Sequence, residues 1–327
     1  MISVERLEKI ATDVKFQPAS VERVIRLIDV LHQIANDREL GKLLALKGGT
    51  ALNLFYLELD RLSVDIDLNY VGAADREAML RDSKIINVRL PALLQSKGYE
   101  IARDPSAEHA GGKWRFRYVS AYRRPGTLEV DVNYLFRTPF FGWERMDSAK
   151  LGDYIATNVA VVDLHEIAAG KIVALVARRA SRDLYDAWRL LQNEEIDWAQ
   201  VKVGALAIGA AARDLDWRTV WLKDYKYDLN DLNNKLVSVV KNGIFDADGG
   251  PKKWCDRILA ECQEKLAPLF KYDDGELAFL DALYDRGSIE VDTLPTDDDV
   301  KKRIEAFPAL RWKAQHVAQH LGRKPGI

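Results

Sequence analysis

The stretch Leu43-Leu-Ala-Leu-Lys-Gly-Gly-Thr-Ala-Leu-Asn-Leu54 joins a short apolar run to a pair of glycines and then to a helix-like pattern. Because glycine accepts backbone conformations that other residues avoid, Gly48 and Gly49 predict a tight turn. The stretch therefore predicts a strand, a turn and a helix in that order, and Thr50 is the predicted N-cap of the helix.

A second stretch, Val64-Asp-Ile-Asp-Leu-Asn-Tyr70, alternates apolar and polar residues as a half-buried strand does. Asp65 and Asp67 therefore point to one face of this strand, and the apolar side chains point to the other. The later stretch Leu128-Glu-Val-Asp-Val-Asn-Tyr134 has the same arrangement of acidic and apolar residues.

Helices and further strands flank these stretches. One amphipathic helix is predicted to begin with Ser20 as its N-cap, and another to run from Asp75 to Lys97 with Gly98 as its C-terminal cap. Three strands are then predicted, at Tyr99–Arg103, Lys113–Tyr122 and Thr127–Tyr134.

The pattern becomes mainly helical from Asp163 onward. Asp163 and Glu166 resemble a capping box, which predicts a long helix over Leu164–Arg179, followed by a second helix near Asp183–Leu191. The sequence therefore predicts the α+β class, with a small mixed-sheet core and N-terminal helices over residues 1–160, and a mainly helical lobe over residues 161–327.

The composition is that of an ordinary globular chain. Its 327 residues are 48% hydrophobic and 30% charged, which argues against a disordered or fibrous protein. The net charge of -2 gives no overall basic field for bulk nucleic-acid binding. Cys255 and Cys262 lack the spacing of a zinc ribbon, and no run approaches the roughly 18 apolar residues of a membrane span. We expect a cytoplasmic protein with no membrane partner.

The aligned aspartates offer oxygen ligands for a divalent cation. Asp65 and Asp67 could hold an ion between them, and Asp131 is the best candidate for a third ligand if the two acidic strands run side by side. Two Mg²⁺ ions about 4 Å apart could lower the pKa of an attacking hydroxyl and stabilise a leaving pyrophosphate.

The glycine turn offers a place for phosphate. Gly48 and Gly49 allow close approach of the backbone, and the following helix would direct N–H groups and the Thr50 hydroxyl toward the phosphate. Taken alone, Gly-Gly-Thr is more often only a turn, and Asp-x-Asp is as often a solvated strand face. The order of turn, paired aspartates and further acidic strand favours a nucleotide site.

Four ordered motifs carry a family resemblance: Lys47-Gly-Gly-Thr-Ala-Leu-Asn-Leu54, Arg61-Leu-Ser-Val-Asp-Ile-Asp-Leu68, Lys171 on a helix, and Arg182-Asp-Leu-Tyr-Asp186. On these motifs the chain resembles the AbiEii/AbiGii-type nucleotidyltransferase toxins of the DNA polymerase β-like superfamily. The resemblance implies transfer of a nucleotide from a nucleoside triphosphate (NTP), and a cognate antitoxin that is commonly a DNA-binding protein. For some members it also implies transfer to the 3′ acceptor end of tRNA.

The resemblance also implies site residues. It places Lys171, Asp183 and Asp186 in the active site, and Arg61 and Ser63 in a nucleotide-binding motif. Asp186 could instead orient Lys171 or an arginine through a charge-assisted hydrogen bond, and the sequence leaves the roles of the two aspartates open.

A cationic stripe is predicted if the helix that starts at Leu164 continues to Arg182. Lys171, Arg178 and Arg182 would then lie near one face and could bind the triphosphate. For Arg178 a solvated position is equally consistent with the pattern, whereas the apolar neighbours of Lys171 favour a functional role.

Two basic segments have simpler explanations. Lys113-Trp-Arg-Phe-Arg-Tyr118 could stack a nucleobase, but an edge strand with a solvated face is preferred. The tail from Arg311 to Lys324 could contact RNA, but a solvated terminal helix is preferred.

Three functions are weighed on this basis: a Mg²⁺-dependent nucleotidyltransferase toxin acting on tRNA, a related enzyme that modifies a protein or small-molecule hydroxyl, and a degenerate nucleotide-binding module. The third is disfavoured because the carboxylates of Asp65, Asp67 and Asp131 would repel one another without a cation.

Overall fold

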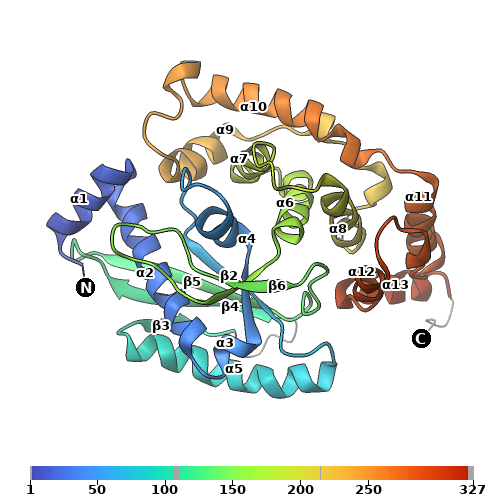
Figure 1. Cartoon of the computed structure of the whole chain (residues 1–327), viewed down its shortest axis with the longest axis horizontal. Coiled ribbons are helices and arrows are strands. Elements are labelled where there is room, and N and C mark those ends of the chain that lie inside the picture. Colours follow the sequence, from blue (N-terminus) through green and yellow to red (C-terminus); the bar gives the residue numbers. More distant parts are fainter. Residues whose placement is uncertain (1, 106–110, 214, 323–327) are drawn as a thin grey trace. The chain divides into compact units, whose positions relative to one another are not determined.

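The computed structural model describes residues 2–105, 111–213 and 215–322. The chain divides into two compact units (Figure 1). The first unit contains Met1–Arg137, Trp143–Val162 and Leu236–Ala247, and the second contains Thr138–Gly142, Asp163–Lys235 and Asp248–Ile327. The predicted domain boundary at residue 160 stays a prediction.

Within the described residues, the first unit is built on a seven-stranded sheet. Strands β1 and β2 are antiparallel, whereas β2 pairs with β5 and β1 with β7 in parallel. This mixed sheet, together with its helices, confirms the predicted α+β class. The order across the sheet is β3 (Glu100–Arg103), β4 (Gly111–Val119), β5 (Pro125–Asn133), β2 (Asp65–Tyr70), β1 (Leu44–Lys47), β7 (Val159–Val162) and β6 (Trp143–Met146).

The apolar faces of the strands form the core of this unit. Ile66 on β2 and Val130 on β5 are fully buried, and each alternates with half-buried acidic residues. Helix α2 (Pro18–Asn36) packs against β2 and β7, and α5 (Arg76–Ser96) packs against α2 and β3 (Figure 1). Burial of apolar surface, at about 25 cal/mol per Å², stabilises this arrangement and leaves the acidic strand faces for other contacts.

The three predicted strands are confirmed as β3, β4 and β5. Strand β4 lies between β3 and β5, so its predicted edge position is wrong. Strands β6 and β7 were not predicted. The run Val159-Ala-Val-Val162 is buried at every position, and an apolar run without alternation does not distinguish a short strand from a helix segment.

Helix ends in the first unit are set by local backbone chemistry. Helix α5 begins at Arg76 after its N-cap Asp75, one residue from the predicted start, and Gly98 beyond its end has a φ of +84°, which glycine adopts without strain. Helix α2 begins at Pro18 with Gln17 as its N-cap, so the predicted cap at Ser20 is wrong. Proline is preorganised for the first helical position, which moves the start three residues earlier.

The remaining helices of the first unit are α1 (Val4–Val14), α3 (Leu40–Leu43) and α4 (Gly48–Ala51). Those of the second unit are α6 (Leu164–Arg178), α7 (Ser181–Leu190), α8 (Trp198–Ala210), α9 (Leu229–Asp231), α10 (Pro251–Lys265), α11 (Asp274–Asp281), α12 (Asp298–Glu305) and α13 (Pro308–His320). In the described part of the chain, no helix combines the length and the apolar character needed to cross a bilayer.

The start of α6 departs from the predicted capping box. Asp163 caps the helix by accepting a hydrogen bond from the His165 N–H at 2.8 Å. Glu166 instead accepts from the backbone N–H of Phe140 at 2.5 Å. A buried carboxylate requires donors, and this backbone segment supplies two, since the Phe141 N–H also donates to Glu166 at 3.3 Å.

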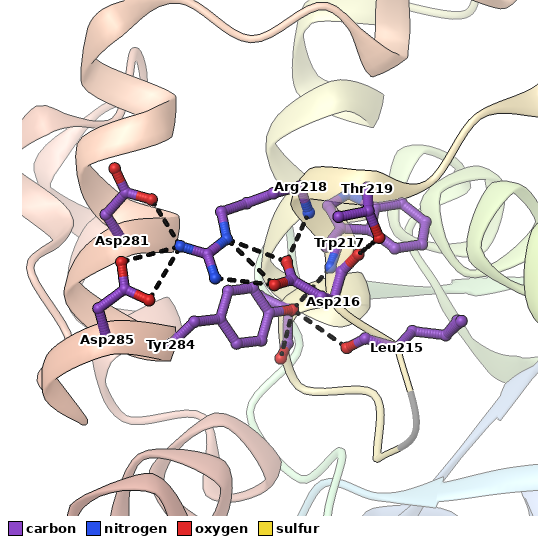
Figure 2. A network of polar contacts seen from close by, with 9 residues as sticks. Leu215, Asp216, Trp217, Arg218, Thr219, Asp281, Tyr284 and Asp285 are labelled. Atoms are coloured by element: carbon purple, nitrogen blue, oxygen red, sulfur yellow. Dashed lines mark hydrogen bonds and ion pairs between the residues drawn. The ribbon is translucent and has the colours of Figure 1, made fainter. Parts of the chain in front are cut away.

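A single arginine ties two segments of the second unit together. The Arg218 guanidinium, in the turn η2 (Trp217–Thr219), donates to the Asp216, Asp281 and Asp285 carboxylates at 2.7 to 2.9 Å (Figure 2). The Tyr284 ring lies under the same guanidinium, 5.0 Å from its carbon. The turn is thus fixed to the helical segment that carries Asp281 and Asp285.

Candidate active site

The two acidic strands lie side by side, as the prediction required. In the parallel pair of β2 and β5, Asp67 is opposite Asp131 and Asp65 is opposite Glu129. Residues directly opposite one another project from the same face of a sheet, so the four carboxylates share one face. Glu129 is an addition to the predicted set, although the alternation of Leu128-Glu-Val-Asp131 contained the signal for it.

Two basic residues on β4 face these carboxylates. The Lys113 Nζ lies 3.1 Å from Glu129 Oε2 and 4.0 Å from Asp131 Oδ2. Burial lowers the pKa of Lys113, but the hydrogen bond to Glu129 and the nearby charges of Glu129 and Asp131 outweigh it and raise the pKa. Arg115 binds the other oxygen of Glu129, at 2.7 Å. Burial raises the pKa of Glu129, and its two basic partners outweigh that effect, so the pKa is lowered.

The carboxylates are neighbours rather than a closed metal cage. Over the described ranges, no three His, Cys, Asp or Glu side chains converge on a point that could hold a metal. Carboxylate oxygens are nevertheless the ligands that Mg²⁺ prefers, and Asp67 and Asp131 stand opposite one another on a partly exposed face. The chemistry of these donors therefore suits a divalent metal, and metal binding itself stays a prediction.

The glycine turn lies directly against this acidic face. Gly48 has a φ of +74°, and a Cβ at this position would lie 2.7 Å from Asp67 Oδ2. Glycine is thus required here both by the backbone conformation and by the approach of a carboxylate.

Thr50 connects the turn to β2. Helix α4 begins at Gly48 with Lys47 as its N-cap, so the predicted cap at Thr50 is wrong, because the turn itself is already helical. The buried Thr50 hydroxyl donates to the Asp65 carbonyl oxygen at 2.5 Å. The structure therefore shows a positioning contact for Thr50, and phosphate binding by Gly48, Gly49 and Thr50 stays a prediction.

The segment before β2 is anchored by a buried arginine. Arg61 is 2% exposed, and its guanidinium donates to the Leu62 carbonyl oxygen at 3.1 Å. Its backbone forms an antiparallel bridge with Val240. Ser63 is half-buried. Nucleotide binding by Arg61 and Ser63 stays a prediction.

In the second unit, Lys171 on α6 is held by two aspartates of α7. Its Nζ lies 2.6 Å from Asp186 Oδ2 and 3.6 Å from Asp183 Oδ1. The Lys171 side chain is 11% exposed and that of Asp186 is fully buried. The short contact agrees with a role for Asp186 in orienting Lys171, and the roles of Asp183 and Asp186 stay a prediction.

The predicted cationic stripe does not lie on one continuous helix. Helix α6 ends at Arg178, because Arg179 adopts a left-handed conformation with a φ of +55°, and Arg182 belongs to α7. Arg178 lies 3.0 Å from Asp183 and its side chain is 64% exposed. The stripe of Lys171, Arg178 and Arg182 was inferred from unbroken helical spacing, and the helix break removes that basis.

The aromatic residues of β4 face the core. Trp114 and Phe116 are buried, and Tyr118 is nearly so. Stacking of a nucleobase on these rings is therefore excluded, because other residues of the protein already cover them, among them Arg26 over the Tyr118 ring. The alternation of bases and aromatics reflects the two faces of a strand.

The remaining predictions concern the helical half. Cys255 and Cys262 are free thiols buried on α10, and burial raises the pKa of each to about 12. The basic tail forms α13 as far as His320, and Arg323 and Lys324 lie outside the described residues.

Comparisons with known proteins place this fold. A solved structure of MenT4, a nucleotidyltransferase toxin from Mycobacterium tuberculosis H37Rv, matches 95% of this chain and 100% of its own length, with a TM-score of 0.58 and 16% sequence identity. At this identity the match shows a shared fold, which is that of a nucleotidyltransferase. No curated protein matches the sequence.

A family model described as the nucleotidyl transferase AbiEii toxin of type IV toxin–antitoxin systems matches residues 29–265. The chain belongs to this family and is a nucleotidyltransferase. Family membership implies an NTP as substrate and an antitoxin as partner.

Proposed function

We propose that this nucleotidyltransferase uses Mg²⁺ bound by Asp65, Asp67 and Asp131 to transfer a nucleotide from an NTP to an RNA, with the 3′ end of tRNA as the acceptor. The observation that carries the proposal is the pairing of Asp67 opposite Asp131, with Gly48 against the Asp67 carboxylate. Bound Mg²⁺, as one or two ions, would lower the pKa of the acceptor hydroxyl and stabilise the leaving pyrophosphate.

The chain's own groups set the geometry of this reaction. In the transfer, the acceptor oxygen bonds to the α-phosphorus, the bond to pyrophosphate breaks, and the hydroxyl proton leaves to water. The turn at Gly48 and Gly49 allows phosphate to approach the backbone beside Asp67. Thr50, bonded to the Asp65 carbonyl oxygen, fixes the turn to the strand that carries both aspartates.

In the second unit, the proposal assigns triphosphate binding to Lys171 and Arg178. Asp186 and Asp183 position these cations through the contacts at 2.6 Å and 3.0 Å. Arg182, at the start of α7, is assigned a supporting charge for the same anion.

Labelled nucleotides test the reaction and its acceptor. The purified protein would be incubated with total cellular RNA, Mg²⁺ and each labelled NTP in turn. Label on tRNA supports the proposal, whereas label on protein or on a small molecule would favour an enzyme that modifies a protein or small-molecule hydroxyl. Absence of transfer to any acceptor, from folded protein, refutes both.

Toxicity in cells tests the biological assignment. We propose that the enzyme acts in the cytoplasm and that its antitoxin is a DNA-binding protein encoded beside it. Expression should arrest growth, and co-expression of the neighbouring protein should restore it. Continued growth with active enzyme present would contradict the toxin assignment.

A further inference from the structure

A row of charged residues crosses four strands of the sheet, with two carboxylates between two lysines. The registers place Lys113 of β4 opposite Asp131 of β5, Asp131 opposite Asp67 of β2, and Asp67 opposite Lys47 of β1. Each of the two central carboxylates therefore has a lysine as its outer cross-strand neighbour. The Lys47 Nζ lies 4.9 Å from the centre of the Phe136 ring.

Lys113 lies against the proposed metal ligands. Its ammonium lies between Glu129, at 3.1 Å, and Asp131, at 4.0 Å. Repulsion among these carboxylates does not by itself require a metal, because an ammonium already offsets it. The clustered carboxylates are therefore weaker support for a bound metal than the sequence pattern alone indicates.

We propose that Lys113 is a resident counter-cation that a divalent metal must displace from Asp131, so that Lys113 sets the metal affinity of the site. The inference rests on the proposed function, because it uses Asp131 and Asp67 as metal ligands. Lys113 can move, since its side chain is 38% exposed and ends in a flexible stem. With Lys113 in place, a metal alone binds weakly, because it exchanges one cation for another.

Arg115 provides a matched control on the same strand and the same face. It binds Glu129 at 2.7 Å, and its register partner is Glu129 rather than Asp131. Lys113→Met and Arg115→Met each remove one positive charge, but only the first removes the charge beside Asp131.

The test measures Mn²⁺ binding by electron paramagnetic resonance without nucleotide, using the full chain. Lys113→Met should raise Mn²⁺ affinity about fivefold to tenfold, whereas Arg115→Met should change it less than about twofold, because charge interactions at solvated sites fall off with distance. Lys113→Arg, which keeps the charge, should bind Mn²⁺ like the unmodified protein. Lys113→Gln serves as a second neutral variant if the methionine variant folds poorly.

The outcomes separate this inference from the proposed function. If Lys113→Met leaves the affinity unchanged, or if Arg115→Met raises it equally, the role of Lys113 is refuted while the metal site stands. If Mn²⁺ binding is the same in the unmodified protein and in Asp67→Asn, the metal assignment itself fails.

Discussion

Lys113 and Lys171 both lie among carboxylates, but in different surroundings. Lys113 stands on a sheet face with a side chain that is 38% exposed, and its contacts are 3.1 and 4.0 Å long. Lys171 lies inside the helical unit, 11% exposed, and is 2.6 Å from the fully buried Asp186.

This difference in exposure determines which of the two ion pairs can open during function. Separating an exposed pair costs at most about 1 kcal/mol, because water solvates both partners. Removing one partner of a buried pair costs roughly 3–5 kcal/mol, because an unpaired charge stays in a poorly solvated place. Lys113 is therefore exchangeable, whereas Lys171 is fixed by Asp186.

The largest change is expected in the rate of nucleotide transfer when Asp67 is replaced. Comparison with a second carboxylate on the same sheet face separates loss of catalysis from loss of stability. Asp67→Asn should lower nucleotide transfer by about 10³-fold or more, because it removes a proposed metal ligand while keeping the size of the side chain. Glu129→Gln is the matched control from the same face, and it should lower transfer less than tenfold. Transfer rates with labelled NTP and thermal melting of both variants check this. Equal losses of transfer rate in the two variants would contradict the assignment of Asp67 as a metal ligand.

The next effect concerns the buried pair. Asp186→Asn should reduce the free energy of unfolding by roughly 3–5 kcal/mol, since Lys171 would keep a buried charge without its closest partner. Glu129→Gln should cost at most about 1 kcal/mol, since its partners Lys113 and Arg115 are partly exposed. Urea unfolding followed by circular dichroism measures both, and similar losses would show that burial does not distinguish the two clusters.

The sequence predicted much of the acidic face because its signal is local. Alternation over Val64–Tyr70 and Leu128–Tyr134 fixed which side chains share a face, and the structure confirms that the two strands are neighbours. The cap at Asp75 and the glycine at position 98 follow from equally local chemistry. Metal binding by Asp65, Asp67 and Asp131 stays a prediction.

What the sequence could not provide is the register between strands. Lys113 meets Asp131 only because β4 and β5 pair in one particular alignment, and that alignment depends on tertiary packing. The break between α6 and α7, by contrast, agrees with the predicted helices over Leu164–Arg179 and near Asp183–Leu191. It falls at the left-handed Arg179 and separates Arg182 from Lys171.

The smallest change in stability is expected at Arg218. It tests whether the exposure of an ion-pair cluster alone determines how much the cluster stabilises the protein. Arg218, in the second unit, is 25% exposed and binds three carboxylates (Figure 2). Arg218→Met should reduce the free energy of unfolding by roughly 1–2 kcal/mol, a loss between those expected for the partly exposed pairs of Glu129 and for the buried pair of Lys171 with Asp186. The control Arg286→Met, which removes an exposed pair with Glu290, should cost less than about 0.5 kcal/mol.

The pH dependence of this loss gives the sharper test. The hydrogen bond from Arg218 lowers the pKa of Asp216 below its usual 3.8. A carboxyl group with a lowered pKa in the folded state stabilises the protein above its unfolded pKa, and that contribution is lost as pH falls through the folded value. The difference in stability between the unmodified protein and Arg218→Met should therefore be constant above about pH 5 and shrink below pH 4. A difference that stays constant down to pH 2 would mean that packing of Arg218 against Tyr284, rather than charge, holds the turn.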